Sequence, residues 1–282
     1  MTEALYTGLI AIALLLCIAG LGVPIAFAIG LVGAGGMYLT VGVTYTIITF
    51  QSLPYATASE YAFAVIPMFV LMGAIAAASG IVTELYGAVN RWLEGVRGGL
   101  FMATTVASAG FAAISGSTVV NAAMFTRIAL PEMMRLGYHK GVSAGCIAAA
   151  GTFAALIPPS LTFVIFGILT EQSIGALFMA GILPGLLTAA FYIAFVPLMV
   201  RLRPGWAPPT IDTSTFKEKF LGLKGLWPML ALVFIVLGGI YTGITPPTAA
   251  GALGAVGALF IAIARRRITT SGVWDSFKQT AE

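Results

Sequence analysis

Residues 110–121 read Gly-Phe-Ala-Ala-Ile-Ser-Gly-Ser-Thr-Val-Val-Asn, and residues 151–160 read Gly-Thr-Phe-Ala-Ala-Leu-Ile-Pro-Pro-Ser. Both stretches contain residues that interrupt helices, yet each lies in a run that is apolar enough to sit in lipid. Hydrocarbon cannot satisfy free backbone N–H and C=O groups, so non-helical backbone survives at membrane depth only where protein or an aqueous cavity surrounds it. The sequence therefore predicts that the two interruptions face each other inside the protein.

The composition indicates an all-α integral membrane protein. Hydrophobic residues make up 59% and charged residues 9% of the 282 positions, and the mean hydropathy is +1.01. In soluble proteins, roughly a quarter of all residues are charged. A net charge of +4 gives no indication of nucleic-acid binding, because Lys and Arg gather in loops next to the membrane. Apolar runs that approach the ~20 residues needed to span a ~30 Å core cover residues 4–21, 24–42, 62–82, 141–168, 177–200, 226–243 and 248–264.

The basic residues form four clusters, which the positive-inside rule places in the cytoplasm. These clusters are Arg91 with Arg97, then Arg127, Arg135 and Lys140, then residues 201–224, and finally residues 265–267. Only one apolar run, at 98–126, separates the first two clusters, and a single crossing there would place one of them outside. A re-entrant hairpin over 98–126 resolves the conflict, because two arms of about twelve residues reach ~18 Å, a little over half of the core. One long, tilted helix is the alternative. The same count places the N-terminus in the periplasm and makes residues 43–61 an interfacial or arm segment.

The predicted hairpin tip is rich in small oxygen-bearing side chains, namely Ser115, Ser117, Thr118 and Asn121. The helix that begins near Thr118 would direct free N–H groups and its positive dipole end at the midplane. Carbonyls and hydroxyls suit Na⁺, and helix N-termini suit a carboxylate. The tip is therefore a candidate site for a sodium ion and an anionic substrate, and the alternative is that these residues only cap and pack the hairpin.

Pro158 and Pro159 predict a broken helix over 141–168. Two prolines remove two backbone donors and push the preceding residue out of helical geometry. Carbonyls between Gly151 and Leu156 then lose helical partners and become available to a cation, while Ser160 caps the outer half-helix. A simple kink is the alternative.

No catalytic chemistry is indicated. Residues 141–145 formally match a Gly-x-Ser-x-Gly nucleophile elbow, but that motif needs a preceding strand and a positioned His, so we interpret the match as chance. No acidic or basic residue falls clearly at the midplane, which disfavours a proton relay. Glu84, Glu94 and Glu132 lie among basic residues and are expected to be solvated.

Residues 204–225 are predicted to form a cytoplasmic linker between a first repeat, 1–203, and the beginning of a second, 226–282. The two parts begin alike, at turns between apolar runs. Gly20, Pro24 and Ala26 recur in register as Gly243, Pro247 and Ala249. The first turn is predicted to be cytoplasmic and the second external, which is the relation expected of an inverted repeat.

Motifs along essentially the whole chain resemble, in order and spacing, the large membrane subunit of TRAP transporters, the DctM type. They are residues 67–73 (Pro-Met-Phe-Val-Leu-Met-Gly), 79–80, 114–117 (Ile-Ser-Gly-Ser), 130–133 (Leu-Pro-Glu-Met), 137–138, 156–160 (Leu-Ile-Pro-Pro-Ser), 173–175 and 181–185 (Gly-Ile-Leu-Pro-Gly). The resemblance implies a sodium-driven importer of carboxylates in the bacterial inner membrane. It also implies a periplasmic binding protein and a small membrane subunit as partners, and no cofactor beyond the coupling ion. The family fold has inverted repeats and moves substrate by an elevator-like shift.

Carried onto this sequence, the resemblance assigns site residues at both interruptions. The sodium-binding set is Ser115, Ser117, Asn121, Gly151, Thr152, Ile157 and Pro159, and the substrate-binding set is Ser117, Thr118 and Ser160. Two local departures are Phe153-Ala154, where the family often has Leu-Gly, and Ala249, where it usually has Glu. Family subunits also continue beyond Glu282 with a second hairpin and a second broken helix. We therefore expect an N-terminal portion that a second polypeptide completes, and the alternative is a truncated, non-transporting membrane scaffold.

Overall fold

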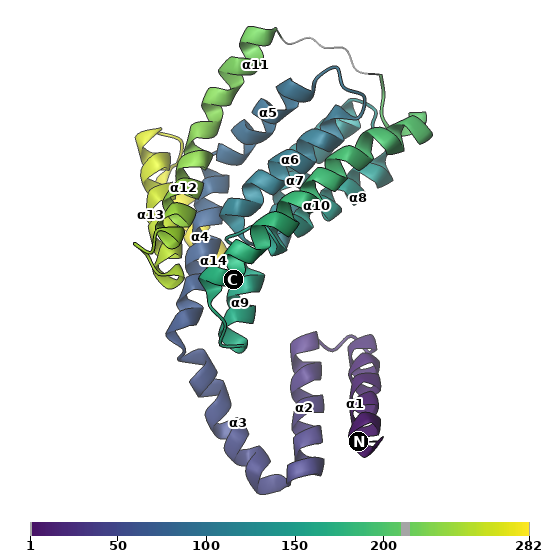
Figure 1. Ribbon diagram of the computed structural model, residues 1–282, viewed down its shortest axis with the longest axis vertical. Coiled ribbons are helices and arrows are strands. Elements are labelled where there is room, and N and C mark those ends of the chain that lie inside the picture. Colours follow the sequence, from purple (N-terminus) through teal and green to yellow (C-terminus); the bar gives the residue numbers. More distant parts are fainter. Residues whose placement is uncertain (1, 210–214, 282) are drawn as a thin grey trace. The chain divides into compact units, whose positions relative to one another are not determined.

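The computed structural model describes residues 2–209 and 215–281. Every regular element in these residues is helical, as the composition predicts (Figure 1). The chain divides into two compact units, residues 1–61 and 62–282. The predicted linker, 204–225, includes residues 210–214, which lie outside the described residues. Its repeat boundaries therefore stay a prediction.

The first unit contains three consecutive helices, α1 (Thr2–Gly20), α2 (Ile25–Val41) and α3 (Val43–Ala58). The turn from α1 to α2 passes through Gly22, whose φ is +86°, a conformation that glycine adopts without steric strain. Pro24 follows as the residue that caps α2. The segment predicted as interfacial or arm-like is therefore mostly α3, which has no buried residue and contains Pro54.

The second unit is organised around α4 (Val65–Ala78), most of whose residues are buried. Helix α13 (Pro247–Ala264) packs along α4 through glycines. A Cβ atom on Gly254 would collide with the Met72 sulfur, and one on Gly251 would lie 3.1 Å from the Met68 Cβ atom. Small residues therefore bring the two helices together closely, as is typical of helix packing in membranes.

Helices α6 (Gly99–Ser115) and α7 (Thr118–Arg135) form an antiparallel hairpin. Near its open end the rings of Phe101 and Tyr138 lie 4.8 Å apart, and nearer the tip those of Phe111 and Phe125 lie 6.3 Å apart. Residues 98–126 are therefore not one continuous tilted helix, and the re-entrant path of the hairpin in the membrane stays a prediction. The arms are longer than predicted, with 17 and 18 residues, because α6 occupies all of 99–115 and α7 continues past position 126 to Arg135.

The predicted break in the segment 141–168 is confirmed. Helix α8 (Lys140–Gly151) runs into a short 3₁₀ turn, η2 (Thr152–Ala155), and α9 (Leu161–Leu169) begins after a non-helical stretch. The Pro158–Pro159 peptide bond within that stretch is cis. Helix α10 (Ile174–Leu202) follows and packs against the break through Gly185, whose added Cβ would lie 2.8 Å from the Ile157 side chain.

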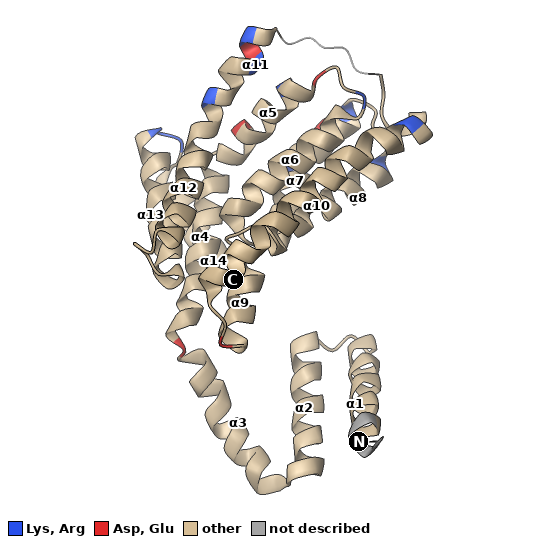
Figure 2. Cartoon of the chain, viewed as in Figure 1, with Lys and Arg blue, Asp and Glu red and all other residues tan. Residues whose placement is uncertain are grey.

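The remaining elements of the second unit include the short turns η1 (Tyr61–Ala64), η3 (Pro204–Trp206) and η4 (Lys224–Leu226). The helices are α5 (Ile81–Leu93), α11 (Phe216–Leu223), α12 (Trp227–Tyr241) and α14 (Thr270–Ala281). Among the described residues, four helical stretches are long and apolar enough to cross a membrane, and they are 61–78, 174–202, 216–241 and 247–264. Lys and Arg gather toward one end of the helices in this unit (Figure 2).

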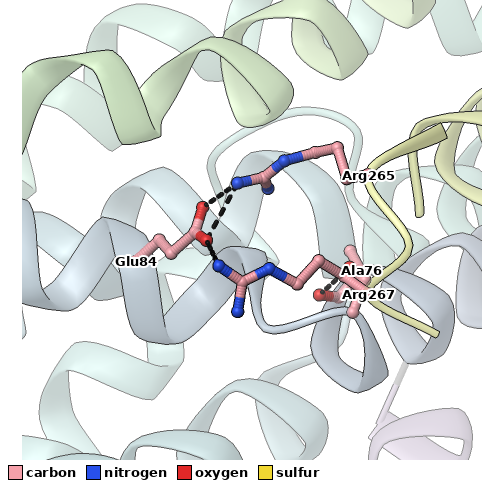
Figure 3. Close-up of polar contacts among 5 residues, drawn as sticks. Ala76, Glu84, Arg265 and Arg267 are labelled. Carbon is pink, nitrogen blue, oxygen red and sulfur yellow. Dashed lines mark hydrogen bonds and ion pairs between the residues drawn. The ribbon is translucent and has the colours of Figure 1, made fainter. Parts of the chain in front are cut away.

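One acidic residue differs from its prediction. Glu84, on α5, is not simply solvated, because its carboxylate accepts hydrogen bonds from Arg265 at 2.7 and 2.9 Å (Figure 3). Arg267 lies 3.7 Å from the same carboxylate. Glu84 and Arg265 side chains are 25% and 19% exposed. We call these three residues the charged clasp. It ties the beginning of α5 to the end of α13, a contact between distant sequence positions that no local pattern reveals.

Candidate functional site

The tip of the hairpin and the break in the α8–α9 segment are in direct contact. The backbone N–H of Leu161 donates a hydrogen bond to the Gly116 carbonyl oxygen at 3.1 Å. Gly116 has a φ of +59°, and a Cβ atom there would lie 2.8 Å from the Pro159 carbonyl oxygen. Only glycine allows this close approach of two backbones. The prediction that the two interruptions face each other is thus confirmed, and we call residues 115–118 and 156–161 the break junction.

Two helix N-termini meet at the break junction. Ser117 caps α7, with its hydroxyl oxygen accepting a hydrogen bond from the Val120 N–H at 3.4 Å. Ser160 caps α9 in the same way through the Phe163 N–H at 3.5 Å. The cap at Ser160 was predicted, and the cap at Ser117 matches the alternative in which the tip residues cap the hairpin. The N-terminal ends of helices carry partial positive charge, so their meeting point favours an anionic group.

Two chain segments also end at the junction, where the Ala155 carbonyl oxygen already accepts a hydrogen bond from the Ser160 hydroxyl at 2.9 Å. Helix α6 ends at Ser115 and the η2 turn ends at Ala155. The C-terminal ends of helices carry partial negative charge and unsatisfied carbonyl oxygens. The junction therefore offers groups of both signs, carbonyl oxygens for a cation and N–H groups for an anion, without a formally charged residue.

A polar network lies beside the junction and joins α6, α7 and α8. The Asn121 amide donates to the Ser108 carbonyl oxygen at 3.1 Å. The Ser108 hydroxyl lies 3.0 Å from the Asn121 Oδ1 atom and 2.9 Å from the Ala150 carbonyl oxygen. A hydroxyl has one proton, so it can donate fully to only one of these two acceptors. One of the two acceptor oxygens is therefore left without a proton from the Ser108 hydroxyl, although Ser108 and Asn121 are completely buried.

Ser115 presents a second excess oxygen. Its side chain is 1% exposed, and its hydroxyl has no hydrogen-bond partner. A buried hydroxyl without a partner is unfavourable by about 1–3 kcal/mol. Gly73 of α4 packs directly against the Ser115 backbone, where a Cβ atom would lie 2.9 Å from the Ser115 Cα atom. The unpartnered hydroxyl is thus enclosed by protein and suits a ligand that coordinates oxygen.

The other predicted site residues differ in placement. Ile157, Pro159 and Ser160 are buried in the break, and Gly151 is buried against α7, where its added Cβ would lie 2.9 Å from the Ala122 Cβ atom. Thr118 is partly buried in the first turn of α7. Thr152 is exposed, and its hydroxyl donates to the Ala149 carbonyl at 2.6 Å. The Thr152 side chain therefore faces away from the residues that the fold brings together.

Sequence reasoning missed Ser108 and the Ala150 carbonyl. Both lie outside the quoted interruptions, within helices that read as regular apolar arms. The available signal was the spacing of hydroxyl residues on α6, since Thr104 and Ser108 are four residues apart and both are completely buried. Residues four apart lie on one face of a helix, so this spacing indicates a polar face directed into the protein.

Comparisons with known proteins identify the family of the chain. The profile of the family described as "Tripartite ATP-independent periplasmic transporter, DctM component" matches residues 10–282. The chain is 36% identical over 209 residues to the C4-dicarboxylate TRAP transporter large permease protein DctM of Pseudomonas aeruginosa, covering 74% of this chain and 48% of that protein. It is 34% identical over 269 residues to the isethionate TRAP transporter permease protein DctMQ of Oleidesulfovibrio alaskensis, covering 92% and 40%.

A third relative is the 2,3-diketo-L-gulonate TRAP transporter large permease protein YiaN of Escherichia coli, which is 33% identical over 261 residues, covering 90% of this chain and 59% of that protein. The chain thus spans about half the length of the curated relatives it matches. The family consists of transporter subunits and not of enzymes. With an all-helical fold and a matching profile over nearly its whole length, the chain belongs to the DctM family of TRAP transporter large permease subunits.

Proposed function

We propose that this chain forms the first half of the ion and substrate cage in a sodium-coupled TRAP transporter that imports carboxylates. The break junction carries the proposal, because two helix N-termini and the C-terminal ends of α6 and η2 lie there without any formal charge. In secondary transporters, half-helix N-termini bind anionic substrate groups, and unwound carbonyls with half-helix C-termini coordinate Na⁺. Coupling by a metal cation held on neutral oxygens fits this arrangement better than a proton relay, which needs ionisable groups in the membrane.

The proposed sodium ligands are oxygens of Ser115, Ser117 and Asn121, with backbone carbonyls of Gly151, Thr152, Ile157 and Pro159. The excess acceptor capacity at Ser108 and Ser115 supports this set, since a cation would occupy oxygens that lack a proton donor. The Asn121 amide acts by orienting Ser108 toward Ala150. For the substrate, we assign Ser117, Thr118 and Ser160, because the first turns of α7 and α9 present N–H groups to one point.

The proposal extends to the substrate class and to the partners. The names of the three relatives give a C4-dicarboxylate, isethionate and 2,3-diketo-L-gulonate as transported solutes, and all three are organic anions. A carboxylate delivered by a periplasmic binding protein fits a site with two helix N-termini. A small TRAP membrane subunit is the second proposed partner. The basic ends of the helices in Figure 2 would face the cytoplasm of the bacterium and the N-terminus the periplasm, by the positive-inside rule.

We further propose an elevator-type movement. The hairpin and the α8–α9 segment contact each other through backbone at the break junction, so these elements would move as one body. Inverted repeats are a recurrent basis of alternating access in transporters. Each of the two turns, α1–α2 and α12–α13, contains one glycine with a positive φ, Gly22 at +86° and Gly243 at +73°, although these two glycines are two positions out of register. The beginning of a second repeat in residues 226–282 therefore rests on the sequence register and stays a proposal.

Sodium binding can be tested on the purified chain by thermal unfolding in detergent. A ligand that binds only the folded state adds roughly 1.4 kcal/mol of stability at ten times its Kd. We expect NaCl to raise Tm above its value in equimolar KCl or choline chloride. The variant Ser115→Ala removes a buried hydroxyl that has no partner, so its Tm without sodium should be no lower than that of the unmodified chain, and it should lose most of the sodium-specific increase.

Thr126→Ala is the matched control, because Thr126 is exposed and its hydroxyl bonds only to the Ala122 carbonyl in its own helix. It should respond to sodium as the unmodified chain does. Equal Tm values in sodium and potassium, or a full sodium response in Ser115→Ala, would show that the assigned cation site is wrong.

Transport itself requires the complete system. We would co-express the chain with a polypeptide that supplies the second half, a small TRAP subunit and a binding protein, and measure uptake of labelled carboxylates with and without sodium. Sodium-dependent uptake that falls at least about tenfold in Asn121→Leu supports the proposal, since leaving buried polar groups unpaired is unfavourable by about 1–3 kcal/mol. No uptake from a complete, membrane-inserted system would favour the non-transporting scaffold.

A further inference from the structure

A second cavity lies between α6, α8 and α10, away from the break junction. It has a volume of about 290 Å³, and six of its lining residues are Phe101, Cys146, Tyr192, Phe195, Val196 and Trp206. Its lining atoms are almost entirely apolar. Along α8 the lining extends from Val142 to Ala149, a distance of about 10 Å at 1.5 Å per residue. We call this cavity the apolar groove.

The polar side chains within the apolar groove are already engaged. The Thr105 hydroxyl donates to the Phe101 carbonyl oxygen at 2.9 Å, and the Cys146 thiol lies 3.7 Å from the same oxygen. An occupant therefore gains no hydrogen bond from either of them. Burying a polar group without a partner is unfavourable, so the part of a ligand that enters this groove must be apolar.

One end of the apolar groove is bordered by positive charge. At that end lie Val142, Val200 and Trp206. Lys140 begins α8 two residues before Val142, and Arg201 directly follows Val200 near the end of α10. Arg203 follows shortly after Arg201. The Trp206 carbonyl oxygen accepts a hydrogen bond from the His139 backbone N–H at 3.1 Å, which connects the segment after α10 to the beginning of α8.

A fourth basic residue approaches the same end from the base of the hairpin. The Arg97 guanidinium lies 3.5 Å from the Pro204 carbonyl oxygen, and the next residue, Gly98, packs against Val196 and Val200. The four basic residues are all exposed, and no acidic residue lines the groove among the described residues. The charge at this end is therefore net positive.

From this combination we infer that the apolar groove binds one acyl chain of an anionic phospholipid, whose phosphate contacts the basic end. An apolar channel that ends in exposed Lys and Arg matches an amphiphile with an anionic head. Gly145 and Phe195 are exposed on its outer side, so the groove opens to the surface of the unit, where the membrane supplies the lipid. Basic residues near helix ends attract anionic lipids, and basic pockets between transmembrane helices bind their head groups. The lipid would brace α10 against the hairpin.

Native mass spectrometry of the purified chain can test this inference with two lipids that have identical acyl chains, phosphatidylglycerol and phosphatidylcholine. We expect one phosphatidylglycerol to be retained with about a tenfold preference, because each basic residue near an anionic head group contributes to binding. Equal retention of the two lipids would overturn the inference. So would loss of the bound lipid when the small subunit is added, because a polypeptide would then be the occupant.

Two variants locate the binding to the groove. A Cβ atom on Gly145 meets nothing within 4 Å, so Gly145→Leu should fold normally, fill the groove and abolish retention. Gly87→Leu, at another open helical glycine on α5, is the matched control and should retain the lipid. Tm values of both variants check folding. Unchanged retention in a folded Gly145→Leu variant would show that the lipid binds elsewhere.

Charge variants test the head-group contact separately. Replacing Lys140, Arg201 and Arg203 together by Gln should remove the preference for phosphatidylglycerol while apolar binding remains. Replacing three exposed basic residues away from the groove, Arg127, Lys217 and Lys224, removes the same charge and should leave the preference intact. An equal effect of the two triple variants would mean that net charge, and not this site, selects the lipid. None of these outcomes depends on sodium, so they are independent of the proposed transport function.

Discussion

The break junction and the charged clasp hold distant parts of the second unit together by different physical means. At the junction, Gly116 and Leu161 meet through a backbone hydrogen bond, and no ionised side chain takes part. At the clasp, Glu84 and Arg265 meet through a charge-assisted pair that is roughly one-fifth to one-quarter exposed. The first region depends on shape and helix dipoles, and the second depends on formal charge.

This difference follows from the surroundings of each region. A formal charge at membrane depth is strongly unfavourable, whereas helix ends supply partial charges without an ionisable group. The junction therefore offers partial charges of both signs while it carries no formal charge, which suits the ion binding that we propose for it. Near a helix end, water can solvate the charged atoms that the two side chains do not satisfy for each other, so a full ion pair is tolerated. The same chain uses neutral groups at the proposed binding site and formal charges at the clasp.

The largest expected effect on stability comes from adding a side-chain atom at Gly116, where the two backbones approach each other at the junction. In Gly116→Ala, the new Cβ atom meets the Pro159 carbonyl oxygen at 2.8 Å, and the left-handed conformation adds about 1–2 kcal/mol of strain. We expect a total loss of about 2–4 kcal/mol in the free energy of unfolding. Thermal and denaturant unfolding in detergent measure it.

Gly137→Ala is the matched comparison, because Gly137 has a φ of +81° but nothing within 4 Å of an added Cβ. It should lose only the strain of about 1–2 kcal/mol. The difference between the two variants isolates the contact between the hairpin and the break. If they lose equal stability, the two backbones do not approach as closely as Gly116 indicates.

How much the sequence predicts differs between these two regions. The junction was predictable because helix-breaking residues can be recognised from the local sequence alone. The glycine and serine run at 115–118 and the paired prolines at 158–159 favour interruption of a helix, and an apolar context leaves the protein interior as the place for the free backbone. The cap at Ser160 was correctly assigned from that logic, whereas capping at Ser117 was only the alternative to a binding role. The roles of these residues in binding sodium or substrate stay predictions.

The charged clasp was not predictable from the same sequence. Glu84 and Arg265 are separated by 181 positions, and each taken alone resembles an ordinary solvated charge beside a helix end. Only the packing of α13 along α4 brings them together. Ser108 was missed for a related reason, since its partners Asn121 and Ala150 come from two other helices. Local patterns reveal where a helix must end, but they do not reveal which side chains meet across helices.

Breaking the clasp is expected to have the next largest effect. Glu84→Gln leaves the partly buried Arg265 guanidinium without its anion, and the Nη1 atom of Arg265 has no partner already. A hydrogen bond to a charged group contributes about 1.5–3 kcal/mol, so we expect a loss of about 2 kcal/mol. The loss should shrink in 1 M salt, where the intact pair is itself screened.

The comparison for this variant is Asp275→Asn, which removes the 3.8 Å pair between Asp275 and Lys278. Those side chains are 72% and 58% exposed, so the loss should stay below about 0.5 kcal/mol. Denaturant titrations at low and high salt measure both variants. A Glu84→Gln loss as small as that of Asp275→Asn would mean that the clasp is only a surface contact. Gly116→Ala, by contrast, should lose the same stability at both salt concentrations.

A smaller effect is expected from the helix caps. Ser160→Ala removes an acceptor for the Phe163 N–H and the donor to the Ala155 carbonyl at 2.9 Å, both in a buried site. We expect a loss of about 1–2 kcal/mol, the upper part of the range for caps. Ser173→Ala removes a cap that is exposed at the beginning of α10, and it should lose about 0.5–1 kcal/mol. Equal losses of unfolding free energy in the two variants would show that burial does not increase the stabilisation by the Ser160 cap.

The smallest effect contrasts an ionisable cap with these neutral ones. At the beginning of α11, the Glu218 carboxylate accepts hydrogen bonds from the Thr215 hydroxyl at 2.7 Å and from the Thr215 N–H at 2.8 Å. These two bonds hold the pKa of the fully exposed Glu218 below its usual range. Because the pKa of Glu218 is lower in the folded state, its carboxylate stabilises the beginning of α11 fully at pH values above the unfolded-state pKa of about 4.3. This stabilisation disappears as the pH falls through the lower folded-state pKa.

Titration of the Glu218 carboxyl carbon by NMR should therefore give a pKa below that of a model Glu peptide, and Thr215→Ala should raise it. Amide exchange in the first turn of α11, corrected for the intrinsic rate, should increase over the same acidic range, and Glu218→Gln should abolish that dependence. The first turns of α7 and α9 are capped by Ser117 and Ser160, which do not ionise there, so their corrected exchange should stay constant. An acid-dependent loss of protection at those two turns would contradict the neutral character of the junction, because some ionisable group would then have to contribute to it.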